Sequence, residues 1–270
     1  NGGVFTLLEE GTSTAFADVG TYNLIGYDGA IGGDISNLAV VNTVQDRRYT
    51  FGTAGGFITL NIAVTGFWNG GSGTNVNWSD SDNWNDIAPQ TGDVLSFRTA
   101  GGLSTTLNNN LVSGSSFASL RFDVGAPAFI LDGNSIRLTG DGPGKTIIVN
   151  NSTLTQTVNM NIALGTNGKI DANSGNIVVG GNISGDGYGL TKIGDNKLTL
   201  SGTNTYTGAT TVSAGTLQLD ASGSLTSDVT VSGVGYGPDG AFFSGAERLD
   251  PRRDTALAAA LSTGLLASRA

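Results

Sequence analysis

The fold is decided by residues 189–219, which read GLTKIGDNKLTLSGTNTYTGATTVSAGTLQL. Leu198 and Leu200 alternate with Thr199, and the same pattern of leucine and polar residue returns at positions 217–219. Alternation of aliphatic with polar side chains, rich in threonine, is typical of a half-buried β-strand. Glycines separate these strand signals, so the stretch predicts short strands joined by tight turns.

Pairs of apolar residues two positions apart recur through residues 99–236. They are Leu120/Phe122, Ile136/Leu138, Val158/Met160, Ile177/Val179, Leu198/Leu200 and Leu217/Leu219. Successive pairs begin 16, 22, 19, 21 and 19 residues apart, and further strand signals fall between them. A period of about 20 residues with strand chemistry predicts a β-solenoid with three short strands per turn. The asparagines that we expect to form ladders between its turns are Asn150, Asn151, Asn159, Asn161, Asn173 and Asn176.

Composition limits the classes of function that are open to the chain. Its 270 residues include 43 glycines but 5 prolines, which fits many tight turns rather than a collagen-like period. The formal net charge of −9 argues against a nucleic-acid or anionic-membrane partner, because both need a basic surface. Cysteine and histidine are absent, which excludes disulfides, thiolate metal sites, histidine-ligated zinc and histidine-based triads. No apolar run approaches the roughly 20 residues that a membrane-spanning helix needs.

All three tryptophans, Trp68, Trp78 and Trp84, lie within residues 66–98. Each indole ring buries a large apolar area when it is packed. One interpretation is that the three rings cap the open end of the solenoid that follows. The alternative is that they form a glycan-stacking platform, with their ring faces open to sugars. The sequence leaves both interpretations open.

Residues 189–219 resemble the autotransporter-associated β-strand repeat, which occurs in passenger regions of bacterial autotransporter-like surface proteins. The matching blocks are Gly189-Leu190-Thr191-Lys192, Leu198-Thr199-Leu200-Ser201-Gly202, Asn204-Thr205-Tyr206-Thr207-Gly208 and Thr211-Val212-Ser213-Ala214-Gly215-Thr216-Leu217. Residues 66–98 are similar to the tryptophan-rich opening of a module in such proteins, and residues 1–64 to the close of a preceding module. The resemblance implies a fold and a cell-surface setting, and it implies no reaction.

These patterns predict an all-β chain: a right-handed parallel β-helix, preceded by a short N-terminal β module and followed by a weakly helical tail. We expect residues 1–64 to be the closing β-strand section of a preceding module and residues 65–98 to be a tryptophan-rich connector or cap. Residues 99–236 are then the parallel β-helix, which contains the repeat.

The composition changes abruptly in residues 237–270, where arginine and alanine become frequent. Asp254 is a candidate N-cap of a short helix with Leu257, Leu261 and Leu265 on one face. We expect this tail to be either helical, as a cap on the open edge of the solenoid, or disordered. A shifted reading frame is the alternative origin of its composition.

Three features were candidates for chemistry. Residues 140–146 are superficially like a phosphate loop, but the first glycine is one residue too close and a strand follows. Residues 80–86 are acidic but lack the glycine and glutamate of an EF-hand, which leaves an irregular calcium site as the alternative to a solvated turn. Carboxylates that a polysaccharide-cleaving β-helix would use are Asp123, Asp132, Asp171, Asp186 and Asp195. Because they show no paired motif, we expect no catalytic residue, cofactor or metal.

The sequence therefore predicts a non-enzymatic structural passenger segment that serves as a stalk supporting adhesion. The runner-up is a carbohydrate-binding or polysaccharide-degrading β-helix protein, and a third hypothesis is a folding module that promotes export. We expect glycans or cell-surface proteins as partners, and neither nucleic acid nor membrane insertion by this segment. The expected location is the bacterial cell surface, associated with the outer membrane through other parts of a longer protein, because the chain begins at Asn1 like a fragment or a processed form.

Overall fold

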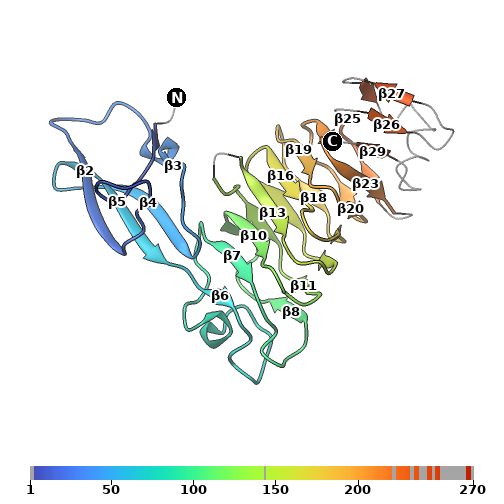
Figure 1. Cartoon of the computed structure of the whole chain (residues 1–270), viewed down its shortest axis with the longest axis horizontal. Coiled ribbons are helices and arrows are strands. Elements are labelled where there is room, and N and C mark those ends of the chain that lie inside the picture. The colour runs from blue at the N-terminus through green and yellow to red at the C-terminus, as the bar shows by residue number, and fades with distance from the viewer. Residues whose placement is uncertain are drawn as a thin grey trace. The chain divides into compact units, whose positions relative to one another are not determined.

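The computed structural model describes residues 3–142, 144–220 and 223–231, and the short stretches 234–236, 242–244, 247–249 and 266–268 (Figure 1). The chain divides into two compact units, of which the first is built mainly from residues up to Gly66 and the second begins at Phe67. Both units are built from β-strands, and the described residues contain no α-helix. None of the short helical turns in this part of the chain is long and apolar enough to cross a membrane.

The first unit is a small antiparallel sheet with one buried face. Its strands lie in the order β2-β5-β4, and the short strands β1 and β3 form a parallel pair in the same unit. The bounds are β1 Val4–Phe5, β2 Gly20–Gly26, β3 Ala39–Val40, β4 Arg47–Ala54, β5 Phe57–Val64 and, for the 3-10 helix η1, Ile35–Asn37. Along β5, Leu60 and Ile62 are buried whereas Asn61 is exposed, as in a strand that turns one face to a core. These two residues and Val40 form the core of the unit.

The second unit is a parallel β-solenoid with three strands in each turn (Figure 1). Along its first face each strand pairs in parallel with the strand three places later, in the order β7-β10-β13-β16-β19-β22-β25. The second face runs β8-β11-β14-β17-β20-β23, and the third runs β9-β12-β15-β18 and continues as the pair β21-β24. In the regular part, Ile148, Ile170 and Lys192 stack on one another 22 residues apart. The predicted all-β fold with a parallel solenoid is therefore confirmed.

The strands of the solenoid are short. On the first face they are β6 Phe67–Trp68, β7 Val94–Phe97, β10 Ser119–Phe122, β13 Thr146–Asn150, β16 Gly168–Asp171, β19 Leu190–Ile193, β22 Thr210–Val212 and β25 Val229–Val231. On the second face they are β8 Thr106–Asn109, β11 Ile130–Gly133, β14 Gln156–Val158, β17 Ile177–Val179, β20 Lys197–Leu200 and β23 Gly215–Leu219. On the third face they are β9 Ser115–Phe117, β12 Ile136–Leu138, β15 Ile162–Leu164, β18 Ile183–Ser184, β21 Thr203–Asn204 and β24 Ser224–Leu225.

The apolar pairs that the sequence singled out are all buried in the solenoid core, but they do not all belong to one row of stacked residues. Leu120 lies on the first face and Ile136 on the third, whereas the last four pairs lie on or beside the second. The aligned row on the second face is Leu107, Leu131, Val158, Val179, Leu200 and Leu219, with spacings of 24, 27, 21, 21 and 19 residues. Apolar and polar residues alternate in the same way on all three faces. The spacing of the pairs along the sequence therefore does not show which face a pair belongs to.

Asparagine side chains link successive turns, as the sequence predicted. The Nδ2 of Asn173 donates to the Oδ1 of Asn151 over 3.0 Å, between residues that are 22 positions apart. The Oδ1 of Asn161 accepts the backbone N–H of Asn182 at 2.9 Å, and other members of the predicted set make similar bonds. These amides satisfy backbone and side-chain groups near the corners, where the strand ladders are interrupted.

Parallel winding gives way to antiparallel pairing after β25. The later strands are β26 Val234–Tyr236, β27 Phe242–Ser244, β28 Glu247–Leu249 and β29 Leu266–Ser268. β26 pairs with β27, β28 with β25, and β29 with β23, all antiparallel. The helix predicted from Asp254 onwards lies outside the described residues.

Candidate functional site: the tryptophan turn and the repeat

The tryptophan-rich segment forms a complete turn against the first turn of the solenoid (Figure 1). On the first face, β6 pairs in parallel with β7. On the second face, the backbone N–H of Trp78 donates to the carbonyl of Asn108 at 3.0 Å. On the third face, the N–H of Gly92 donates to the carbonyl of Ser116 at 3.0 Å. Residues 67–93, called the tryptophan turn from here on, therefore cover the end of all three sheets.

The three indole rings fill the interior of the tryptophan turn. Trp68, Trp78 and Trp84 each have a relative exposure of 0%. Trp84 lies between the other two, with its ring centroid 5.3 Å from that of Trp68 and 5.7 Å from that of Trp78, both edge to face. Its indole N–H donates to the carbonyl of Trp78 at 3.0 Å. The ring of Phe97 lies 5.5 Å from that of Trp84, so the tryptophans continue directly into the core of the first turn.

This geometry bears on both interpretations of the tryptophans. A ring face must be open to solvent to stack on a sugar, and the rings of Trp68, Trp78 and Trp84 are closed to solvent. Rings that cover the otherwise open end of a stacked core are what the cap interpretation expects. Glycan stacking stays a prediction, and it would require the tryptophan turn to open.

A short 3-10 helix positions Trp84. This helix, η2, spans Ser81–Trp84, and the Oδ1 of Asp80 caps it by accepting the backbone N–H of Asp82 at 3.2 Å. The side-chain amide of Asn75 donates to the other carboxylate oxygen of Asp80 at 2.6 Å, and this bond lowers the pKa of the carboxyl. The acidic stretch that suggested a calcium site is thus built as a turn and a helix cap.

The carboxylates considered as catalytic candidates lie on several turns. Three of them accept bonds from neighbouring side chains, whereas Asp171 and Asp195 lie close enough to interact electrostatically with each other and with Lys192. Asp123 forms an ion pair with Arg98 at 2.9 Å. Asp186 accepts the hydroxyl of Thr207 at 2.9 Å, and Asp132 accepts a side-chain amide at 2.8 Å. Within the described part of the chain, no three acidic side chains come close enough together to hold a metal ion.

The stretch that is superficially like a phosphate loop forms a closed turn. Asp141 and Thr146 make an antiparallel bridge across it, and Arg121 forms an ion pair with Asp141 at 3.1 Å. β13 begins at Thr146, so a strand follows the turn, as the sequence predicted. A phosphate would therefore find no helix N-terminus at this point.

Lys192, inside the repeat, is a buried cation that the sequence analysis did not single out. It lies on β19 with a relative exposure of 0%. Its ammonium donates to the carbonyls of Ile193 at 2.7 Å, Gly194 at 2.6 Å and Ala214 at 3.2 Å. The available signal was its position two residues after Leu190, which places both side chains on the same face of the strand.

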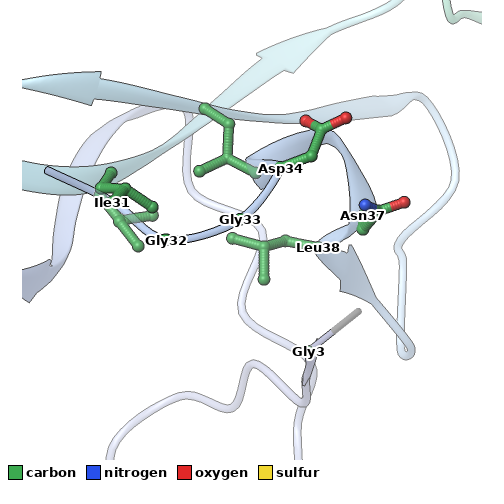
Figure 2. A pocket seen from close by; sticks show the side chains of 9 residues that line it. Gly3, Ile31, Gly32, Gly33, Asp34, Asn37 and Leu38 are labelled. Atoms are coloured by element: carbon green, nitrogen blue, oxygen red, sulfur yellow. The ribbon is translucent and has the colours of Figure 1, made fainter. Parts of the chain in front are cut away.

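A pocket of about 420 Å³ lies in the first unit, beside a glycine-rich loop (Figure 2). Figure 2 shows the side chains of Ile31 and Leu38 near the two glycines of this loop, whereas the carboxylate of Asp34 and the amide of Asn37 point away from them. The complete lining is Gly3, Ile31, Gly32, Gly33, Asp34, Ile35, Asn37, Leu38 and Ile58. The lining side chains are mainly apolar and include a single carboxylate, so they supply no acid–base pair.

The fold by itself defines a class, the parallel β-solenoids, and within it a chain whose first turn is closed by tryptophans. Residues 190–219 match the family model of the passenger-associated-transport-repeat. The repeat recognised in the sequence is therefore confirmed, and this segment is a passenger repeat of the autotransporter type. No curated protein and no solved structure matched the chain. The family of the repeat suggests a secreted or cell-surface protein.

Proposed function

We propose that this chain is a non-enzymatic structural segment of an autotransporter-like passenger, and that it serves as one module of a stalk that supports adhesion. The observation that carries the proposal is the continuity of the solenoid through the passenger repeat. The strands of residues 190–219 belong to the same three stacked faces, and their inward side chains to the same core, as the earlier turns. A segment built in this way transmits force along the stack of turns.

The dimensions of the solenoid suit a stalk that is assembled from several modules. Neighbouring strands in a sheet are separated by roughly 4.8 Å, so the six complete turns of three strands rise by about 29 Å. A length of this order is modest for a surface stalk. The proposal is therefore that the longer protein repeats such modules and presents its binding parts at their end.

The candidate acids interact with side chains of their own chain, which supports the proposal that the segment is not an enzyme. A glycosidase needs two carboxyl groups within about 5–10 Å of each other and in different environments. Asp123 and Asp186 instead hold an arginine and a threonine of their own chain, and the charges of Asp171 and Asp195 act on the buried ammonium of Lys192. Glycans or cell-surface proteins are the proposed partners of the longer protein, bound by parts other than this core.

Force spectroscopy tests the stalk. When the two ends of the chain are pulled, a stacked solenoid should hold its length until single turns unwind. Each turn of about 22 residues should then release roughly 70 Å of chain. Leu198→Asp, which places a carboxylate in the core, is the control that should abolish these steps in the repeat. Smooth extension of the unaltered chain at low force would contradict the stalk.

Binding and turnover assays test the alternative. The purified chain is screened on a glycan array and incubated with a panel of polysaccharides, and the stalk proposal expects neither binding nor cleavage. Specific binding that is lost in a folded Trp78→Ala variant and kept in Trp78→Phe would make the chain a lectin-like adhesin. Cleavage that is lost in Asp186→Asn would make it an enzyme.

A further inference from the structure

The fifth turn of the solenoid, formed by β19, β20 and β21, carries a buried polar side chain at each of its three corners. At the corner between β19 and β20, the ammonium of Lys192 donates to two carbonyls of its own turn and to the carbonyl of Ala214 in the next turn. The charged side chains near it are Asp171, in the preceding turn, and Asp195. Burial lowers the pKa of Lys192 to about 8 and the two carboxylates act against this shift, so the group stays mainly protonated at pH 7.

The second corner follows β20, and Asn204 lies next to it in the two-residue strand β21. Its side chain has a relative exposure of 0%. The Oδ1 accepts the backbone N–H of Ile183 in the preceding turn at 3.0 Å, and the Nδ2 donates to the carbonyl of Ser224 in the next turn at 2.9 Å. A third bond, from Nδ2 to the carbonyl of Gly202 at 2.8 Å, holds the amide to its own turn. This one side chain therefore joins three successive turns.

The third corner lies between β21 and β22 and contains Tyr206. Its hydroxyl lies 2.6 Å from the Oγ1 of Thr210, which lies 2.6 Å from the Oγ of Ser227 one turn further on. All three side chains are buried. Burial also raises the pKa of Tyr206 to about 12, so the phenol stays neutral and keeps its proton for this chain of hydrogen bonds.

Other turns have buried polar side chains at fewer corners. Asn150 and Gln156 serve the first corner of the third turn, and Asn109 serves the second corner of the first turn. Within the described residues, the fifth turn thus has buried polar side chains at all three corners, whereas the other turns just described have them at one corner. This turn lies within the segment that matches the passenger repeat.

The aliphatic core does not specify by itself how these turns align. In the observed register Leu198 lies beside Leu217, and Leu200 lies beside Leu219. If β23 slipped by two residues, Leu200 would lie beside Leu217 and every inward side chain would still point inward, because the side-chain period is two. Turn length varies along the solenoid, so a constant length does not select the register either.

We propose that Lys192, Asn204 and Tyr206 form a three-corner lock that selects the strand register of the repeat against its neighbouring turns. A slip of two residues displaces their partner atoms by about 6.6 Å, which is beyond hydrogen-bond reach. A slipped repeat would therefore bury an ammonium, an amide and a phenol without their partners from the next turn. Buried polar groups select one alignment in this way even where an apolar replacement would be as stable.

Disulfide cross-linking reads the register directly, because the chain has no cysteine of its own. Thr199 lies beside Gln218 in the observed register and would lie beside Thr216 after a slip of two residues. Thr199→Cys with Gln218→Cys reports the observed register, and Thr199→Cys with Thr216→Cys reports the slipped one. Cysteines whose Cα atoms are more than about 7 Å apart do not form a disulfide. Both pairs are introduced separately into the full chain.

With the lock intact, we expect the observed-register pair to oxidise and the slipped pair to stay reduced. Lys192→Met and Tyr206→Phe should each raise the yield of the slipped cross-link several-fold and lower that of the observed one. Lys197→Met is the matched control: it removes a neighbouring lysine that lies outside the core, and the cross-links should not change.

Tyr206→Phe keeps the ring and removes only the hydroxyl. If Lys192→Met fails to fold, this variant still tests whether the buried polar groups select the strand register. Folded Lys192→Met and Tyr206→Phe variants that form only the observed-register cross-link would overturn the lock. The lock would also be overturned if Lys192→Met failed to fold and the separate Tyr206→Phe variant kept the observed register. The buried polar side chains would then stabilise the fold without selecting the register. A rise of the slipped cross-link in Lys197→Met as well would have the same consequence.

Discussion

Replacing Trp84 with alanine should open the capped end of the solenoid and leave the repeat intact. The ring lies in contact with the rings of Trp68, Trp78 and Phe97 and is fully buried. Removing a buried tryptophan costs about 3–5 kcal/mol. Loss of the bond to the Trp78 carbonyl adds about 1 kcal/mol, because that acceptor is left buried. A terminal turn has one neighbouring turn to hold it, so a loss of about 4–6 kcal/mol should unfold it locally.

Two measurements follow this local unfolding. All three tryptophans lie in the tryptophan turn, so the emission of the remaining Trp68 and Trp78 should shift to the red. Amide hydrogen exchange should lose protection in residues 94–122, next to the cap, and keep it in residues 190–219. Trp84→Phe preserves most of the ring packing, so it should show a clearly smaller effect. The reasoning is refuted if Trp84→Ala keeps its emission and its protection, or if protection falls equally in both segments.

Three further predictions concern the core and the spacing of the turns. Leu198→Asp loses the burial of a leucine, about 1.5–3 kcal/mol, and adds an unpaired buried carboxylate, whereas Thr199→Asp on the outer face should change denaturant stability by about 0.5 kcal/mol or less. Equal stability of the two variants would mean that Leu198 faces outward. Lys192 has a folded-state pKa of about 8, below its ordinary value of 10.5, so the free energy of unfolding should rise by up to about 3 kcal/mol between these pH values. Lys192→Met should remove that rise, and a flat profile of the unaltered chain would contradict a buried ammonium. A Cβ at position 181 would overlap the carbonyl of Met160 in the preceding turn, so Gly181→Ala should cost about 1–3 kcal/mol in thermal unfolding. An unchanged melting temperature would mean that the two turns are further apart.

The passenger repeat and the solenoid could be predicted because their signals are local or periodic. Leu198 and Leu200 show the two-residue alternation of a strand, and glycines mark the turns that follow. The recurrence of such pairs can be recognised without knowing which face of the solenoid each pair occupies. For the same reason, the spacing of the pairs could not show that Leu120 and Ile136 lie on different faces of the solenoid.

The burial of the three tryptophans could not be predicted from their neighbours in the sequence. The sequence alone does not distinguish a cap from a sugar-stacking platform for Trp68, Trp78 and Trp84, because an indole ring can serve either purpose. Their burial depends on β6 and the segments after it pairing with strands that lie 24 or more residues further on. No spacing within residues 66–98 contains that information.

By itself, the sequence determined that this protein consists of short alternating strands, glycine turns and a passenger repeat, since each of these depends on neighbours along the chain. The tertiary structure alone decided which face each strand joins, that the tryptophans close the first turn, and that Lys192 points into the core. The physical reason is that each turn is held by residues about 20–30 positions away. A side chain whose chemistry suits both the surface and the interior takes its role from those distant partners.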